Sequence, residues 1–248
     1  MKVIAIIPAA GLGTRMAAAE AAPRSAVGKG PSKQFAELRG VPVLVHTLRR
    51  FAASPRVSEI YVALRKAEAD SFAPRLEQEG LGQKVRLVEG GEHRQQSVAN
   101  ALAQVSAAPD DIILVHDAVR PLVDEEIIEN VIRGVEKHGA VIAGVPAVDT
   151  VKQVERSAEN AIITATVPRE RVVLAQTPQG FRFHILKKAF DEATADGFVG
   201  TDEASLVERS GQQVAVVMGS ARNLKITTPA DLELAEFYMS HPARRAAG

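Results

Sequence analysis

Residues 3–15 read VIAIIPAAGLGTR, an apolar run that ends in a loop of small residues. A short, nearly continuous apolar run is typical of a strand that is buried on both faces of a parallel sheet. Similar runs recur at residues 57–64, 85–88, 112–115, 140–145 and 214–218. Helical patterns lie between these runs, so the sequence predicts a doubly wound α/β sheet.

Two of the predicted helices have clear ends. Asp124 is expected to cap the start of one of them, and Gly139 stands where its C-terminal cap belongs. Near the end of the chain, Thr228 is expected to cap a helix that has Pro229 at its first position and Asp231 completing a capping box. These signals support the alternation of strands and helices.

Two segments break this alternation. Residues 17–32, AAAEAAPRSAVGKGPS, have no apolar period and are predicted to form a mobile loop. Residues 148–166 contain DTVKQV and AIITATV, which read as two short strands around a polar turn. This hairpin has no place in a parallel sheet, so it is expected to project as an arm over about residues 147–170. No domain boundary is evident, and a single domain is predicted over residues 1–248.

The composition excludes several classes of protein. The 248 residues include 30 Lys plus Arg against 30 Asp plus Glu, which argues against a polyanion such as nucleic acid as the main partner. An aromatic fraction of 4% is low for base stacking. The absence of cysteine excludes disulfides and thiolate zinc sites and agrees with a reducing compartment. No stretch reaches the ~20 apolar residues of a membrane span, so a cytoplasmic protein without a membrane partner is predicted.

The loop after the first apolar run has the composition of an anion site. Small residues let the backbone approach a ligand, and the guanidinium of Arg15 can bind phosphate oxygens. An ordinary strand-to-helix turn is the alternative interpretation. The loop lacks the third glycine of a dinucleotide fingerprint. The small residues in question are Ala9, Ala10, Gly11 and Gly13.

Three further stretches are candidates for chemistry. Lys33 follows the predicted mobile loop and could return to the same phosphates, or simply be solvated. Residues 90–97, GGEHRQQS, lie between a strand and a helix, where Ser97 could bind a ligand or cap the helix. Asp117 and Arg120 follow a buried strand; the carboxylate is a natural metal or hydroxyl ligand, and an ion pair between the two is the alternative. No HExxH or GxSxG motif occurs.

Nine motifs occur in a fixed order along the chain: PAAGLGTRM, PSKQF, GGEHRQQSV, VHDAVRP, DTVK, TVPRE, QTPQGF, TDEAS and NLKITTPADLELAE. Together they resemble the 2-C-methyl-D-erythritol 4-phosphate cytidylyltransferase family of isoprenoid biosynthesis, over about residues 3–238. The resemblance implies an α/β nucleotidyltransferase with a Rossmann-like, mostly parallel sheet and a β-arm that is exchanged across a homodimer. It also implies Mg²⁺-dependent reaction of CTP with a polyol phosphate, with release of pyrophosphate.

The resemblance implies roles for individual residues. Those expected to bind CTP are Ala9, Ala10, Gly11, Gly13, Arg15, Lys33, Gly90, Glu92, Ser97 and Asp117. Those expected around the acceptor are Asp117, Arg120, Thr150, Arg169, Thr177, Thr201 and Lys225. Arg15, Lys33 and Lys225 are implied to be catalytic through their charge, and Asp117 is implied to lie at the metal. The loop before Lys33 is longer than is usual, which makes Arg24 and Lys29 alternative phosphate contacts.

Two other functions remain open at this level. A sister enzyme that acts on another polyol phosphate, such as ribitol 5-phosphate, has overlapping motifs and would differ around the acceptor. A noncatalytic nucleotide-sensing module on the same fold is the second. The presence of Arg15, Lys33 and Lys225 argues against it.

Overall fold

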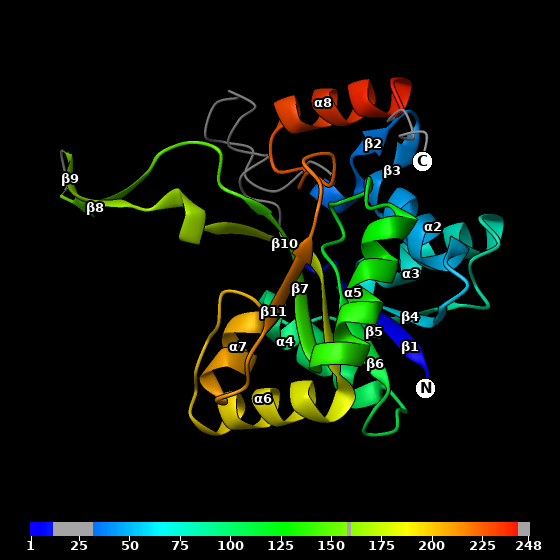
Figure 1. Cartoon of the computed structure of the whole chain (residues 1–248). Helices are drawn as coiled ribbons and strands as arrows, with labels where there is room; N and C mark the ends of the chain where they lie inside the picture. The colour runs from blue at the N-terminus through cyan, green and yellow to red at the C-terminus, as the bar shows by residue number, and fades with distance from the viewer. Residues whose placement is uncertain (12–31, 158–159, 243–248) are drawn as a thin grey trace, which may run out of the picture.

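A computed structural model of the chain describes residues 1–11, 32–157 and 160–242. A sheet of seven strands lies at its centre, flanked by helices (Figure 1). The strand order is β11-β7-β10-β6-β1-β4-β5, and only β10 runs antiparallel to its neighbours. The prediction of a mostly parallel α/β sheet is therefore confirmed. The strands are β1 (Val3–Pro8), β4 (Val57–Leu64), β5 (Val85–Glu89), β6 (Ile112–Val115), β7 (Ala140–Pro146), β10 (Val173–Arg182) and β11 (Ala215–Met218).

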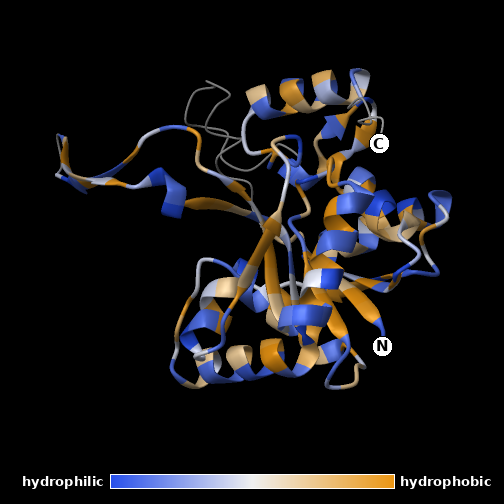
Figure 2. Cartoon of the chain, viewed as in Figure 1, coloured by the Kyte–Doolittle hydropathy of each residue, from blue (hydrophilic) through white to orange (hydrophobic). Residues whose placement is uncertain are grey.

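Helices cover both faces of this sheet. One apolar cluster joins α2, α3 and α5 to one face, and a second joins α4, α6 and α7 to the other. Figure 2 shows the apolar colour concentrated in the central strands. Helix α8 packs beside a small hairpin of β2 (Glu37–Leu38) and β3 (Val41–Pro42). The helices are α2 (Val43–Ala53), α3 (Lys66–Gln78), α4 (Arg94–Gln104), α5 (Glu125–His138), α6 (Phe183–Ala195), α7 (Glu203–Arg209) and α8 (Pro229–Ser240).

The predicted helix ends are found where the sequence places them. Asp124 Oδ1 accepts a hydrogen bond from the N–H of Ile127 at 2.8 Å, which caps α5. Gly139 ends that helix with a φ of 82°, a conformation that glycine adopts without steric cost. Thr228 and Asp231 form a capping box at the start of α8.

Strand β10 is the one strand of the seven-stranded sheet that the sequence pattern does not predict. Its residues 176–179 are polar or proline, yet Gln176, Thr177 and Gln179 are buried. Pairing with β7 shifts register between Ala175 and Gln179. The side chain of Gln179 bonds to Asp202 and to the N–H of Ala204, at 2.8 and 3.0 Å. Hydrogen-bond partners that are distant in sequence thus satisfy the buried polar side chains of this strand. Because those side chains are polar, the strand has no continuous apolar run in the sequence.

The predicted hairpin is present as β8 (Val151–Arg156) and β9 (Ala161–Val167), a separate two-stranded sheet. It projects from the body of the molecule (Figure 1). The predicted mobile loop at residues 17–32 lies outside the described residues except for Ser32. No helix in the described part of the chain is long and apolar enough to cross a membrane.

Candidate functional site

The loops that carry most of the predicted site residues lie at one edge of the sheet, because parallel strands end on the same side. The loops after β1 and β5 meet at the end of β4. The N–H of Ala9 donates to the carbonyl of Ala63, and the N–H of Gly90 donates to the carbonyl of Leu64, both at 2.8 Å. Gly11 is exposed just beyond this contact. The predicted phosphate ligands Gly13 and Arg15 lie outside the described residues.

Ser97 shapes the loop after β5 from inside α4. Its hydroxyl accepts a hydrogen bond from the N–H of Gly91 and donates to the carbonyl of His93, both at 3.0 Å. The N-cap of α4 is His93, so the alternative that Ser97 caps its helix is wrong. Glu92 is exposed between them, and its N–H bonds to Gln96 Oε1 at 3.0 Å. The loop is thus held in one shape by its own helix.

Gly90 packs directly against the small-residue loop. A methyl group at Gly90 would overlap Cβ of Ala10 and lie 3.3 Å from Ser97 Oγ. The absence of a side chain at this position is what brings the two loops together.

We expect Gly90→Ala to raise KM for CTP, the substrate that the resemblance implies, about tenfold or more and to cost about 1–3 kcal/mol of stability, because the loops must separate to admit the methyl group. Steady-state kinetics and thermal melting test this. The double variant Ala10→Gly/Gly90→Ala removes the overlapping methyl group and should recover most of the loss. An unchanged KM in the single variant would contradict the close packing.

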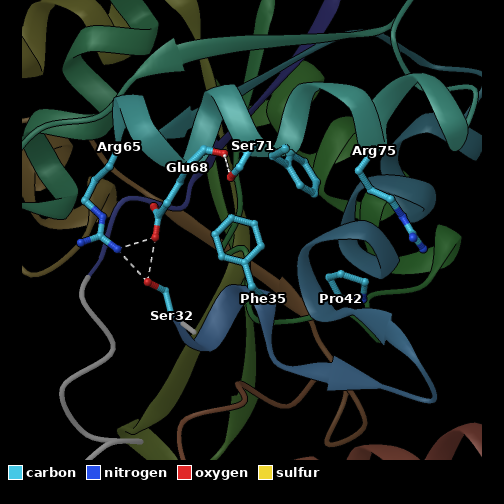
Figure 3. Close-up of a pocket in the computed structure, with 8 residues that line it drawn as sticks. Ser32, Phe35, Pro42, Arg65, Glu68, Ser71 and Arg75 are labelled. Carbon is cyan, nitrogen blue, oxygen red and sulfur yellow. Dashed lines mark hydrogen bonds and ion pairs between the residues drawn. The ribbon is translucent and has the colours of Figure 1, made fainter. Parts of the chain in front are cut away.

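The segment that carries Lys33 is fixed beside the same loop. Lys33 belongs to a short 3-10 helix, η1 (Lys33–Phe35), and Gln34 is buried with its Nε2 donating to the carbonyl of Ala9 at 2.7 Å. Ser32 Oγ donates to Glu68 Oε1 at 2.7 Å and accepts from Arg65 at 2.8 Å, as Figure 3 shows. These contacts hold the backbone of Lys33 next to the small-residue loop.

A pocket of about 410 Å³ lies between η1 and α3. It is floored by the Phe35 and Phe72 rings, whose centroids are 5.6 Å apart. None of its lining residues is a predicted ligand of CTP or the acceptor. The pocket is therefore not the predicted substrate site, although one of its lining residues, Arg65, directly follows β4.

The charged centre of the site is the carboxylate of Asp117, directly after β6. Lys225 Nζ lies 2.9 Å from Oδ2, and Arg120 Nε lies 3.3 Å from the same oxygen. Arg94 Nε lies 3.3 Å from Oδ1. The predicted residues Asp117, Arg120 and Lys225 are thus brought together, and the alternative of an Asp117–Arg120 ion pair is part of the same arrangement.

Three cations around one acid set the protonation of this centre. Burial alone would raise the pKa of Asp117, but Arg94, Lys225 and Arg120 outweigh it and hold that pKa well below the usual range. Burial likewise favours the neutral form of Arg94, yet its carboxylate neighbours raise its pKa above the ordinary value. Both groups are therefore charged at neutral pH.

A directed chain of hydrogen bonds supports Asp117 from below. The N–H of Asp117 donates to Thr177 Oγ1 at 3.0 Å, and that hydroxyl lies 3.0 Å from His116 Nδ1. His116 Nε2 lies 3.1 Å from the carbonyl of Arg120 and donates to it. Complete burial lowers the pKa of His116 to about 3, so the ring is neutral. The hydroxyl of Thr177 thus orients Asp117, beside its predicted role at the acceptor.

The loop that carries Lys225 is tied to the Asp117 loop and to β10 by hydrogen bonds to backbone carbonyls. Arg120 Nη1 donates to the carbonyl of Asn223 at 2.7 Å, and Asn223 Nδ2 donates to the carbonyl of Thr177 at 2.8 Å. The N–H of Ile226 donates to the carbonyl of Val119 at 2.8 Å. These hydrogen bonds fix the loop and therefore position Lys225 beside Asp117.

Three predicted acceptor residues lie outside this cluster. Thr150 and Arg169 are exposed at the base of the arm, where Arg169 Nη1 donates to the carbonyl of Val148 at 2.9 Å. Thr201 is exposed just before Asp202, the residue that caps α7. The described contacts do not join these side chains to Asp117.

Two members of the cluster were not predicted as site residues. Arg94 Nη1 donates to both carboxylate oxygens of Glu203, at 2.6 and 2.8 Å, in addition to its contact with Asp117. Both residues stand inside quoted motifs, GGEHRQQSV and TDEAS, as charged residues among small and polar ones. A charged residue inside such a motif is the one signal in the sequence that could have indicated a site role. The pairing of Arg94 with Glu203 spans 109 positions, so the sequence does not reveal it.

The surroundings of Asp117 do not fit a resident metal ion. Both of its oxygens already face cations, and a second acid, Glu203, is engaged by Arg94. No group of three or more histidine or acidic side chains in the described residues could hold a metal. The expectation that Asp117 ligates the metal is therefore at odds with the charges around it.

A small-residue loop after the first strand, with cations collected at the carboxyl edge of a mostly parallel sheet, is the arrangement of an α/β nucleotide-binding enzyme. Residues 3–241 match the family IspD: 2-C-methyl-D-erythritol 4-phosphate cytidylyltransferase. The chain belongs to that family, as its motifs predicted, and is thus a nucleotidyltransferase.

Individual relatives agree with this assignment. The 2-C-methyl-D-erythritol 4-phosphate cytidylyltransferase of Acidobacterium capsulatum is 58% identical, over 99% of this chain and 100% of the relative. That of Solibacter usitatus is 51% identical, over 99% of each. The crystal structure of the Francisella tularensis enzyme superposes with a TM-score of 0.77 at 34% identity, over 96% of this chain and 99% of that one.

Proposed function

We propose that this chain transfers a cytidylyl group from CTP to 2-C-methyl-D-erythritol 4-phosphate, giving 4-diphosphocytidyl-2-C-methyl-D-erythritol and pyrophosphate in isoprenoid precursor biosynthesis. The observation that carries the proposal is the gathering of Arg94, Arg120 and Lys225 around Asp117 at the sheet edge, in a chain that belongs to the cytidylyltransferase family.

The reaction asks little covalent chemistry of the protein. An oxygen of the acceptor phosphate attacks the α-phosphorus of CTP, forming one P–O bond as the bond to pyrophosphate breaks. Negative charge grows on the nonbridging oxygens and on the leaving group, so positioned cations lower the barrier. Lys33 beside the small-residue loop and Lys225 beside Asp117 are suited to these two charges. An ionised phosphate needs no general base.

We assign the loops after β1 and β5 to CTP and the Asp117 cluster to the acceptor. Mg²⁺ would enter as a companion of the triphosphate of CTP, whose oxygens are the ligands that this ion prefers. The tight packing of Gly90 against Ala10 supports one continuous nucleotide surface across both loops.

The arm supports a homodimer as the working form. Apolar side chains on a soluble hairpin are costly unless another surface covers them. Ile162 is 68% exposed and Ile163 is 59% exposed on β9. We propose that a second copy of the chain covers them, and that Thr150 and Arg169 complete the neighbouring site.

The direct test is pyrophosphate release from CTP with a panel of polyol phosphates. Turnover with 2-C-methyl-D-erythritol 4-phosphate and none with ribitol 5-phosphate is the expected result. The reverse preference would assign the chain to the sister activity. Binding of CTP without turnover of any acceptor would indicate a nucleotide-sensing module.

We also expect CTP to be preferred to UTP by about 10²-fold in kcat/KM, because cytosine offers an amino donor where uracil offers a carbonyl acceptor. Backbone carbonyls around Gly90 and the hydroxyl of Ser97, fixed by two hydrogen bonds, would discriminate between them. Competition between the two nucleotides in one assay measures the ratio. Equal use of both would contradict the assignment of this loop to the base.

A further inference from the structure

Glu203 is a buried carboxylate that the proposed reaction does not use. It is 1% exposed at the first turn of α7. The start of that helix is already capped, because Asp202 and Ser205 form a reciprocal capping box. Helix capping therefore does not account for a second acid at this position, and its side chain is directed instead to Arg94.

Arg94 links three parts of the site through this contact. It begins α4 immediately after the predicted nucleotide loop, contacts Asp117 after β6 and binds Glu203 on α7. A single guanidinium thus connects the nucleotide loop with the acceptor cluster.

The distances show that Arg94 contacts Glu203 more closely than it contacts Asp117. Its contacts with Glu203 are 2.6 and 2.8 Å long, whereas that with Asp117 is 3.3 Å. Lys225 approaches Asp117 more closely, at 2.9 Å. Glu203 therefore holds Arg94 back, and the closest cation on Asp117 is Lys225.

Burial raises the pKa of Glu203, and its contacts with Arg94 oppose that rise. Removing the carboxylate that holds Arg94 would change this balance. The guanidinium of Arg94 is partly buried, with 31% of its side chain exposed. When it loses its main partner it moves toward the nearest remaining carboxylate, because opposite charges attract more strongly where solvent screens them less. That carboxylate is Asp117, where Arg94 would compete with Lys225.

We propose that Glu203 is a positioning residue. It keeps the guanidinium of Arg94 from forming a closer ion pair with Asp117, and so preserves the contact between Lys225 and Asp117 that positions Lys225 for the acceptor phosphate. The inference rests on the proposed function for its kinetic consequence, but its geometric consequence is independent of the reaction.

The kinetic test is Glu203→Gln, which keeps the shape and removes the charge. We expect KM for the acceptor to rise about tenfold and kcat to fall several-fold, with KM for CTP changed by less than about twofold. A general loss of structure would lower the amount of active protein without separating the two KM values. Equal KM values to wild type would overturn the proposal.

A matched control is the buried carboxylate of Asp111, which directly precedes β6, the strand that Asp117 follows. Asp111 is 6% exposed and accepts from the N–H groups of Lys2 and Ala108, at 2.6 and 2.8 Å. Asp111→Asn should lower the melting temperature and leave both KM values unchanged. If it reproduces the Glu203→Gln split, the effect is one of stability.

A double variant and a crystal structure complete the test. Glu203→Gln/Arg94→Gln should be no worse than Arg94→Gln alone, because the competing charge is gone; additive losses would contradict the proposal. In crystals of Glu203→Gln, Arg94 should lie closer to Asp117 and Lys225 farther from it. Unmoved side chains would overturn the inference even if the enzyme proved to act on another acceptor, whereas a wild-type enzyme inactive with methylerythritol phosphate would overturn only the proposed function.

Discussion

Lys33→Ala is expected to lower kcat by about 10²- to 10³-fold, the loss typical of one preorganised charge donor. Lys33 is held next to the small-residue loop by the bond between Gln34 and Ala9 and by the Ser32 contacts to α3. Because the charge on the triphosphate grows in the transition state, kcat should fall by more than KM for CTP rises. Single-turnover measurements of product formation separate the two effects.

The control for this variant is Lys188→Ala. Lys188 is a lysine with a 64% exposed side chain on α6, paired only loosely with Glu192 at 3.7 Å, and its loss should leave turnover unchanged. Near-normal turnover in Lys33→Ala would transfer the phosphate role to Arg24 or Lys29, which lie outside the described residues.

Arg169→Ala and Lys33→Ala, each nearly inactive alone, are expected to restore activity when they are refolded together. Arg169 stands exposed at the base of the arm, just after β9, and its guanidinium is suited to a bidentate contact with the acceptor phosphate. If the arm reaches the neighbouring subunit, a hybrid dimer contains one site with neither lesion. About half of the dimers are hybrids after random mixing, so activity should recover to about a quarter of wild type.

The measurement needs mass analysis of the hybrid dimers beside the rate. Recovery in proportion to the hybrid fraction supports a site shared between subunits. Confirmed hybrids without activity would place Arg169 in the site of its own subunit or remove it from the reaction. In Arg169→Ala alone, KM for the acceptor should rise while CTP binding stays nearly unchanged.

The strands of the sheet could be predicted from the sequence where their buried residues form a continuous apolar run. The strands β4 and β6 were placed at their observed bounds because apolar runs end sharply there. Strand β10 is not predicted because its buried Gln176 and Gln179 are satisfied by hydrogen bonds to Ser220, Asp202 and Ala204, which belong to other segments. A polar strand of this kind is defined by its partners, and no local pattern records them.

The residues of the candidate site likewise fall into those that the sequence could predict and those that it could not. Asp117 and Arg120 could be picked out because they follow a strand directly, and Lys225 because its motif resembles a known family. Glu203 and Arg94 could not, since their importance lies in a contact between two separate segments. The metal expectation at Asp117 rests on its residue type and on the family resemblance, and neither records the cations that the fold assembles around this carboxylate.

The hydrogen bonds beneath Asp117 run in one direction only. A neutral His116 must donate from Nε2 to the carbonyl of Arg120, so its Nδ1 must accept from Thr177, whose oxygen accepts from the backbone of Asp117. The other neutral tautomer would leave Nε2 and the carbonyl of Arg120, both acceptors, facing each other at 3.1 Å. A second proton is disfavoured on an imidazole whose pKa is about 3. This series of hydrogen bonds can therefore neither store nor relay a proton during turnover. In a reaction whose nucleophile arrives already ionised, the imidazole serves as a rigid spacer, and acid–base chemistry is excluded from the floor of the site by burial.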